Sequence, residues 1–326
     1  MNVKPDYLIN NTHQIMNDYP VLNWVTLEDS FKDYRPAIGP DGKSVVFERT
    51  SYASQLRPLA TKLFIVHNLD NAIPQLFLND CDSFQQTRPA WTDDTIALNL
   101  QYDGKSTVWT VDATGNNLNQ IKNTNHCIYP QWAIHSTFKG FVVMNNKLSH
   151  PQSTLLNANG TIITPNLNGK DTNGNTVLGG MPAVFPNKSK LIAFAGQSLH
   201  QGNTNYNQEK NYIFLNAENG KDFLSMPMKP LANLNHFDKQ FQGRAPAISP
   251  DGNYIAFESN RDGHYAIYLF NLSKPENPPI RLTDPTVKLN AQHPKFFPDG
   301  SRLIFSAVYP GHIYSSIAWI DISEYL

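Results

Sequence analysis

A short motif recurs six times along this chain of 326 residues, and this repeat limits the possible folds more than any other feature of the sequence. Each copy begins with a proline, has a large apolar residue two positions later, and leads through a turn into an apolar run. The prolines and the apolar residues are Pro36, Pro89, Pro130, Pro182, Pro246 and Pro294, with Ile38, Trp91, Trp132, Val184, Ile248 and Phe296. Successive copies begin 41 to 64 residues apart, which is close to the interval between four-stranded propeller blades.

Every position of the motif has a structural interpretation as part of a β-hairpin. The opening proline suits the start of an edge strand, where no ladder N–H is required. Three copies then carry a Pro-Asp-Gly turn, in which Asp-Gly favours a tight reversal, at Pro40-Asp41-Gly42, Pro250-Asp251-Gly252 and Pro298-Asp299-Gly300. The runs that follow, such as VVF, LIAF and YIAF, are short, β-rich and bounded by turn residues, so they indicate buried strands rather than helices.

The two ends of the chain complement each other. The sixth copy ends early, because its IAWIDI segment reaches almost to the last residue, while VLNWVTL at residues 21–27 precedes the first copy. We therefore predict that the N-terminal segment adds the outer strand of the last blade, which removes an exposed sheet edge. The predicted fold is all-β: residues 1–19 form an extension, and residues 20–326 form a single six-bladed β-propeller of four-stranded antiparallel blades starting near residues 35, 88, 129, 181, 245 and 293.

Composition excludes several classes of protein. The 26 basic and 27 acidic residues nearly balance, so the total charge gives no reason to expect nucleic acid as a partner. No apolar run reaches the 18 residues of a membrane span, and the first residues show no export signal. Cys81 and Cys127 are too few for a disulfide scaffold, and a bond between them is not indicated. We expect a soluble monomer, cytoplasmic as the sequence stands or periplasmic if an export signal has been removed.

The best-preserved copy carries a more specific signal in Pro246 to Gly252, the strand Ile255 to Phe257, Ser259-Asn260-Arg261-Asp262-Gly263, and Ile267-Tyr268. This pattern resembles the repeat of TolB-like β-propellers, over about residues 20–326 and most strongly in copies 1, 5 and 6. The resemblance implies a binding role, since the TolB propeller binds the peptidoglycan-associated lipoprotein in the periplasm. Only about 20 residues precede the first expected strand, so we expect the N-terminal domain of TolB to be absent here.

Similar repeats also form the propellers of prolyl-oligopeptidase-like serine peptidases and of a metal-dependent oligogalacturonate lyase. A peptidase needs a further hydrolase domain with a Gly-x-Ser-x-Gly elbow, and Gly196-Gln197-Ser198-Leu199-His200 lacks the second glycine. A metal is harder to exclude, because propeller ligands converge from different blades. The candidate imidazoles near the channel mouth, which would act with a group such as Gln292, are His126, His200, His236, His264, His293 and His312. We predict no catalytic residue and no cofactor, with a divalent metal at the mouth as the alternative.

Loop lengths indicate which face of the propeller carries the function. The turns between strands one and two, and between strands three and four, are short. The long connections all fall on the opposite face, at residues 50–61, 166–180, 196–210 and 231–244. Loops on a rigid scaffold are the usual place for recognition.

The residues just before the inner strands supply the predicted binding site at the channel mouth: Arg35, Arg88, Tyr129, Met181, Arg244 and His293. Arginines suit bidentate binding of carboxylates, which points to an acidic peptide or a carboxylate-bearing ligand. An equally weighted alternative is that each arginine pairs with a loop acid, such as Asp33, Asp82 or Asp238. Trp91 and Trp132 are interpreted as packing residues, and Glu48 and Glu258 as a consequence of the repeat rather than an acid–base pair.

Two functions from different classes follow. The favoured one is a non-catalytic module that binds a protein or peptide through its long-loop face and channel mouth. The alternative is a metal-dependent carbohydrate-active enzyme, a polysaccharide lyase or hydrolase, with its site at the same mouth.

Overall fold

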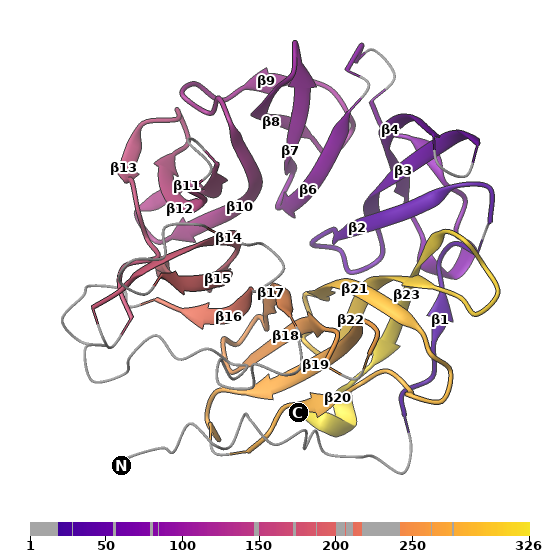
Figure 1. Cartoon of the computed structure of the whole chain (residues 1–326). Helices are drawn as coiled ribbons and strands as arrows, with labels where there is room; N and C mark the ends of the chain where they lie inside the picture. Colours follow the sequence, from indigo (N-terminus) through magenta and orange to yellow (C-terminus); the bar gives the residue numbers. More distant parts are fainter. Residues whose placement is uncertain are drawn as a thin grey trace.

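The structure is a computed structural model that describes residues 19–326 apart from 28, 55–56, 79–80, 84, 147–149, 172–173, 187, 200–205, 207–210, 217–241, 262 and 276. Six antiparallel sheets surround a central axis (Figure 1), which confirms the predicted all-β, six-bladed propeller. Helix among the described residues is confined to short 3-10 turns such as η2 (Leu69–Asn71) and η5 (Ser323–Tyr325). No helix in this part of the chain is long and apolar enough to cross a membrane.

Each sheet runs from an inner strand at the axis to an outer strand at the rim. Blades 1 and 2 consist of β2 (Lys32–Ile38), β3 (Val45–Ser54), β4 (Arg57–Val66) and β5 (Gln75–Leu76), then β6 (Gln86–Thr92), β7 (Thr95–Tyr102), β8 (Lys105–Asp112) and β9 (Asn119–Gln120). Blades 3 and 4 consist of β10 (Cys127–His135), β11 (Phe138–Asn145), β12 (Gln152–Asn157) and β13 (Ile162–Thr164), then β14 (Thr176–Phe185), β15 (Lys188–Leu199) and β16 (Tyr212–Leu215). Blades 5 and 6 consist of β17 (Gly243–Ile248), β18 (Tyr254–Ser259), β19 (Ala266–Asn271) and β20 (Ile280–Arg281), then β21 (Asn290–Phe296), β22 (Arg302–Val308), β23 (Ser315–Asp321) and β1 (Asn23–Trp24).

The N-terminal strand closes the ring as predicted. β1 pairs antiparallel with β23, with Asn23 opposite Trp319 and Trp24 opposite Ala318. The Val25 N–H continues this pairing by donating to the Ile317 carbonyl at 2.8 Å. The last blade therefore takes its outer strand from the other end of the sequence, and its sheet edge is covered.

Apolar side chains from neighbouring sheets form the core between the blades. At the junction of the last and first blades, Ile304 and Ile317 pack with Val45 and Phe47, and all four side chains are fully buried. Similar clusters fill the other junctions. The β-branched runs of the motif thus hold blade to blade, and they fix the inner strands around the axis.

The Pro-Asp-Gly turns rely on the glycine and the aspartate in different ways. Gly42, Gly252 and Gly300 have φ values of 65°, 77° and 76°, a conformation that glycine adopts at little cost. The Asp41 carboxylate instead accepts the backbone N–H groups of Lys43 and Ser44, each at 2.9 Å. In these three Asp-Gly turns the positive φ therefore belongs to the glycine alone.

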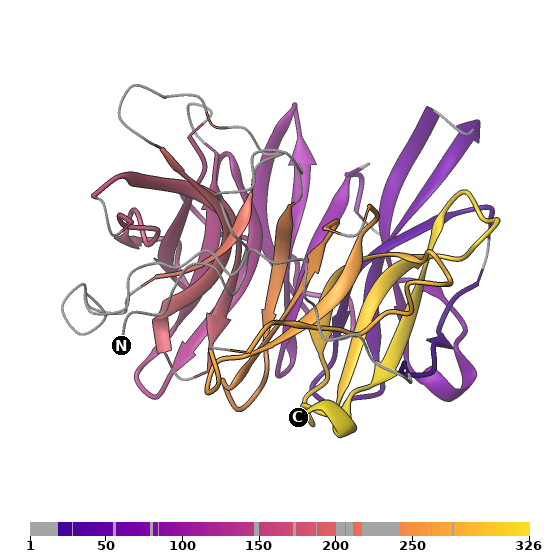
Figure 2. The ribbon, with the colours of Figure 1, turned by 60° about the horizontal axis from the view of Figure 1, so that its bottom comes forward.

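The predicted long loops are partly strands. Residues 50–54 and 57–61 belong to the strands of the β3–β4 hairpin, with Thr50 opposite Thr61, and this hairpin stands out beyond the ring (Figure 2). In blade 4, the pair Gly179 and Gly196 extends the β14–β15 ladder into residues expected to be loop. An added Cβ at Gly179 would meet the Ala195 carbonyl oxygen at 2.2 Å, so the two strands approach closely because side chains are missing. Most of the predicted 231–244 connection lies outside the described residues.

Candidate functional site

A β-bulge interrupts the inner strand of every blade where the strand reaches the axis. The ladder register shifts there in all six blades, and the residue before each motif proline has a positive φ. The φ values lie between 45° and 55° for Arg35, Arg88, Tyr129, Met181, Ala245 and His293. Such values are uncommon for residues other than glycine, but a bulge of this kind requires one. Their recurrence makes the bulge a feature of the blade.

The bulge turns one backbone N–H away from its own ladder and toward the preceding blade. In four blades a polar side chain on the neighbouring second strand accepts it: Arg35 N–H to Ser306 Oγ at 3.0 Å, Arg88 N–H to Glu48 Oε1 at 2.7 Å, Tyr129 N–H to Asn99 Oδ1 at 3.0 Å, and His293 N–H to Glu258 Oε2 at 2.7 Å. The bulges at Met181 and Ala245 have no such acceptor. The equivalent second-strand residues of the preceding blades are Met144 and Ala195, whose side chains carry no oxygen. This hydrogen bond from the bulge therefore joins four pairs of neighbouring blades, in the part of the ring that runs from blade 5 through blades 6, 1 and 2 to blade 3.

The six bulge residues line a narrow neck of about 30 Å³ on the axis, together with five of the six motif prolines and with Gln131 and Lys295. Five of the six residues predicted at the channel mouth belong to this ring, namely Arg35, Arg88, Tyr129, Met181 and His293. The sixth, Arg244, lies one residue before the bulge, so Ala245 takes its place. The Arg244 Nε donates to Glu258 Oε1 at 2.8 Å, and its guanidinium lies over the Tyr265 ring at 4.6 Å.

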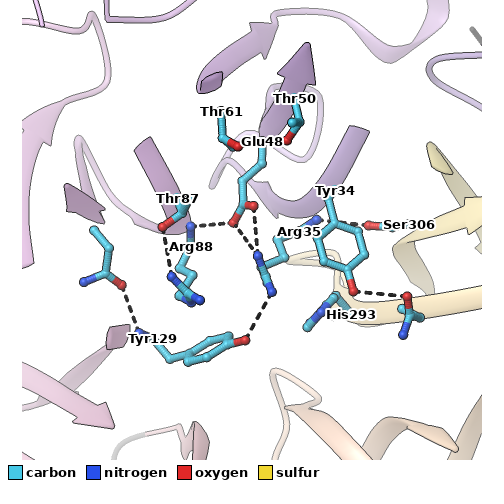
Figure 3. A network of polar contacts seen from close by, with 12 residues as sticks. Tyr34, Arg35, Glu48, Thr50, Thr61, Thr87, Arg88, Tyr129, His293 and Ser306 are labelled. Atoms are coloured by element: carbon cyan, nitrogen blue, oxygen red, sulfur yellow. Dashed lines mark hydrogen bonds and ion pairs between the residues drawn. The ribbon is translucent and has the colours of Figure 1, made fainter. Parts of the chain in front are cut away.

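Glu48 organises the arginines of blades 1 and 2 (Figure 3). Its two carboxylate oxygens accept from Arg35 Nη1 at 3.2 and 2.9 Å, while Oε1 also takes the Arg88 N–H. The Arg35 Nη2 reaches the Tyr129 hydroxyl at 3.3 Å, and the Arg88 guanidinium lies 4.5 Å from the centre of the Tyr129 ring. One buried carboxylate thus fixes two arginines and a tyrosine from three successive blades.

The predicted pairing of the arginines with loop acids is wrong for Asp33, whose carboxylate binds Arg49 at 2.7 Å rather than Arg35. Asp238 lies outside the described residues. The acids that pair with the mouth arginines are Glu48 and Glu258, the two residues to which the sequence assigned no role. The available signal was positional, because each glutamate directly follows the apolar run of a second strand.

Positive charge exceeds negative charge among these residues. Lys32 and the three arginines face the carboxylates of Glu48 and Glu258, and Lys32 Nζ lies 4.3 Å from the Tyr34 ring centre. Burial, followed by the nearby Arg35 and Arg244, holds the pKa of His293 well below its ordinary value, so this imidazole is neutral at pH 7.

The Tyr129 hydroxyl lies in the same positive electrostatic potential. Burial alone would raise the pKa of this hydroxyl, but the charges of Arg35 and Arg88, together with a hydrogen bond from Arg88, outweigh burial and lower this pKa. An arrangement that favours the tyrosinate form of Tyr129 also favours other anions at this point.

A polar cavity of about 550 Å³ opens beside the mouth, over blades 1 to 3. Its lining includes the mouth residues Arg35, Glu48 and Arg88, and residues toward the β3–β4 hairpin such as Lys32, Tyr52 and Thr61. A carboxylate entering this cavity would meet the guanidinium groups at its base.

The histidines predicted as metal candidates are not gathered among the described residues. His126 lines the polar cavity, His264 Nε2 lies 3.3 Å from Arg281 Nη2, and His312 packs on the Tyr309 ring. No three His, Cys, Asp or Glu side chains in the described part of the chain come together as metal ligands, and the metal prediction stays untested, because His200 and His236 lie outside that part. Both cysteines are buried and free, and burial raises the pKa of Cys127 to about 12.

Comparison with known proteins identifies relatives of the fold. No protein-family model and no curated protein sequence matches the chain. Among solved structures, hydrazine synthase of Kuenenia stuttgartiensis is similar with 13% identity and a TM-score of 0.53, over 86% of this chain and 44% of that one. An acylaminoacyl peptidase in complex with Z-Gly-Gly-Phe-chloromethyl ketone has 10% identity and a TM-score of 0.52, over 91% and 52%.

TolB from Acinetobacter baumannii is similar with 12% identity and a TM-score of 0.51, over 75% of this chain. The chain matches 53% of the length of that TolB. Identities this low show the fold alone: the molecule is a six-bladed β-propeller, as the repeat predicted, and its fold is similar to that of TolB.

Proposed function

We propose that this protein is a non-catalytic propeller that binds an acidic segment of a protein or peptide through the channel mouth and the adjoining polar cavity. The observation that carries the proposal is that the Arg88 side chain lacks an acidic partner among the described residues. Its guanidinium contacts Thr87 Oγ1 at 3.0 Å and the Tyr129 ring, but no described carboxylate pairs with it. Its Nε is buried and, within the described residues, lacks a hydrogen-bond acceptor. A ligand carboxylate would supply that acceptor.

The neighbouring charges support an anionic ligand. Glu48 holds Arg35 and the Arg88 backbone, so it positions the two arginines without neutralising both. The Arg35 Nε is likewise buried and lacks an acceptor among the described residues. With Lys32 at the edge of the same cavity, the site offers several donors to successive carboxylates of one peptide.

A titration with fluorescein-labelled hexaglutamate, read by fluorescence anisotropy, tests the proposal, with hexaglutamine of the same length as the neutral probe. We expect hexaglutamate to bind at least tenfold more tightly than hexaglutamine, and added salt to weaken its binding. Equal binding of the two peptides would contradict an acidic ligand. The titration is repeated with EDTA, because loss of binding on chelation would favour the metal-dependent alternative.

Arg88→Gln is the most informative variant, because Arg88 has no acid to leave unpaired among the described residues. We expect it to weaken hexaglutamate binding about tenfold, and replacement of Arg35, Arg88 and Arg244 together to abolish it. The exposed Lys274, in the turn after β19, gives the matched control Lys274→Gln, which should bind as the wild type does. Unchanged affinity in Arg88→Gln and in the triple variant would exclude the mouth as the binding site.

A further inference from the structure

A second cavity opens at the other end of the channel, beside the turns that join the inner and second strands. Its volume is about 400 Å³. Its wall is formed by the large apolar residue of each motif copy, Ile38, Trp91, Trp132, Val184, Ile248 and Phe296. Each of these residues also packs into a core cluster, as the sequence predicted for the tryptophans. Five of the six keep part of their surface exposed.

A pair of polar side chains crosses the axis at the floor of this lower cavity. The residue after each motif proline is Ala37, Ala90, Gln131, Ala183, Ala247 or Lys295. The four alanines leave room on the axis, and the two long side chains belong to blades 3 and 6, which face each other across the ring. Lys295 Nζ donates to Gln131 Oε1 at 3.3 Å. This contact separates the lower cavity from the arginines of the mouth.

Lys295 is half-buried, and its ammonium has no counter-ion among the described residues. An ammonium has three donor hydrogens, and its one described acceptor is the neutral amide oxygen of Gln131. No Asp or Glu is among the described residues that line the lower cavity. Burial lowers the pKa of Lys295 to about 8, so most of these side chains are still charged at pH 7. An uncompensated buried charge is costly to the fold and attracts an anion.

We propose that the lower cavity binds a small aromatic carboxylate, with its ring against Trp91 and Trp132 and its carboxylate on Lys295. The volume lies within the usual range for small-molecule sites, and its described lining combines apolar and aromatic side chains with a few polar groups, of which Lys295 is the one cation. Two tryptophans and two phenylalanines in the lining offer flat surfaces that favour a ring over an aliphatic chain. A single positive charge calls for one carboxylate, in contrast to the several donors of the mouth.

The probe for this site is 2-naphthoate, and isothermal titration calorimetry measures its binding to the full chain. We expect one equivalent to bind, and the neutral isostere 2-naphthamide to bind at least tenfold more weakly. Lys295→Met removes the charge at nearly constant length and should also weaken naphthoate binding at least tenfold, whereas Lys274→Met should leave it unchanged. No binding to the wild type, or equal binding to Lys295→Met, would overturn the proposal.

Two further variants separate this site from the mouth and from misfolding. Arg88→Gln alters the mouth alone, so this variant should keep full affinity for naphthoate. If Arg88→Gln lost naphthoate binding and Lys295→Met kept it, the probe would bind at the mouth, and the proposal would be refuted. Val184→Trp narrows the lower cavity while leaving Lys295 in place, and we expect it to abolish binding. Circular dichroism of each variant confirms that its β-sheet content is retained. The outcome does not depend on the hexaglutamate titration, because the two probes address opposite ends of the channel.

Discussion

The two ends of the channel are built on the same six inner strands, but their charged side chains differ in whether they have a partner of opposite charge. At the mouth, Arg35 and Arg244 are each paired with a buried glutamate, and the glutamates also accept backbone N–H groups from the next blade. At the lower end, the single ammonium of Lys295 faces a neutral amide inside an apolar ring.

The difference follows from position within the repeat. The bulge exposes a backbone N–H to the neighbouring blade, and a carboxylate there satisfies it and then attracts an arginine. The residue after the proline faces the axis, where alanines leave space and nothing in the backbone requires a charge. Charges at the mouth therefore contribute to holding the blades together, whereas the charge of Lys295 has no such structural reason among the described contacts. This contrast predicts opposite effects on stability.

The largest effect is expected for Glu258→Ala. Glu258 is fully buried, and its removal leaves Arg244 without its carboxylate and the His293 N–H without its acceptor. Breaking a buried pair in this way should lower the free energy of unfolding by about 3–5 kcal/mol. Urea unfolding followed by circular dichroism measures the change.

The control for this variant is Glu324→Ala, because Glu324 is exposed near the C-terminus and should change stability by less than about 0.5 kcal/mol. A loss in Glu258→Ala no larger than in the control would show that the mouth carboxylates do not hold the blades together.

Lys295→Met should raise the free energy of unfolding at pH 7, in contrast to Glu258→Ala. The pKa of Lys295 is about 8 in the folded chain and about 10.4 in an unfolded one, so between these values the unfolded chain binds more protons. Stability of the wild type therefore rises with pH across this window, and below pH 8 the charged lysine destabilises the fold in full. We expect the methionine variant to be more stable than the wild type at pH 7 by about 1–3 kcal/mol, and the gain to fall to about a quarter of that value at pH 10.

Urea titrations of both proteins at pH 7 and pH 10 measure this difference, with Lys274→Met as the control. A destabilised Lys295→Met at pH 7 would mean that the contact with Gln131 stabilises the fold, and the two ends of the channel would then not differ.

The repeat predicted the fold because its signals are local. A proline, an Asp-Gly turn and a β-branched run each restrict the backbone within a few residues, and six copies can bury their apolar faces only by stacking in a ring. The prediction of a loop at residues 50–61 was wrong for residues 50–54 and 57–61, which many polar side chains made look like a loop. Cross-strand pairs such as Thr50 with Thr61 keep these residues in the ladder.

The position of the candidate site residues was predicted in part, for the same reason, whereas their role in binding stays a prediction. The register of the repeat correctly placed Arg35, Arg88, Tyr129, Met181 and His293 at the axis. In blade 5 it indicated Arg244, but the residue that adopts the positive φ of the bulge is Ala245. The partners Glu48 and Glu258 and the meeting of Lys295 with Gln131 are contacts between blades. Sequence spacing within one blade holds no information about such distances.

The smallest effect is expected for Ser306→Ala, which tests the bulge without disturbing a charge. Ser306 Oγ accepts the Arg35 N–H at 3.0 Å, in the place that Glu48 and Glu258 occupy in their blades, and it is buried. Leaving that N–H without an acceptor should cost about 1 kcal/mol, because the hydroxyl takes part in no described ion pair. Ser306→Asn, which restores an acceptor like the one Asn99 provides, should recover most of the loss in urea unfolding. If Ser306→Ala cost as much as Glu258→Ala, the backbone N–H rather than the ion pair would dominate the mouth, and the contrast with the lower end would rest on hydrogen bonding instead of charge.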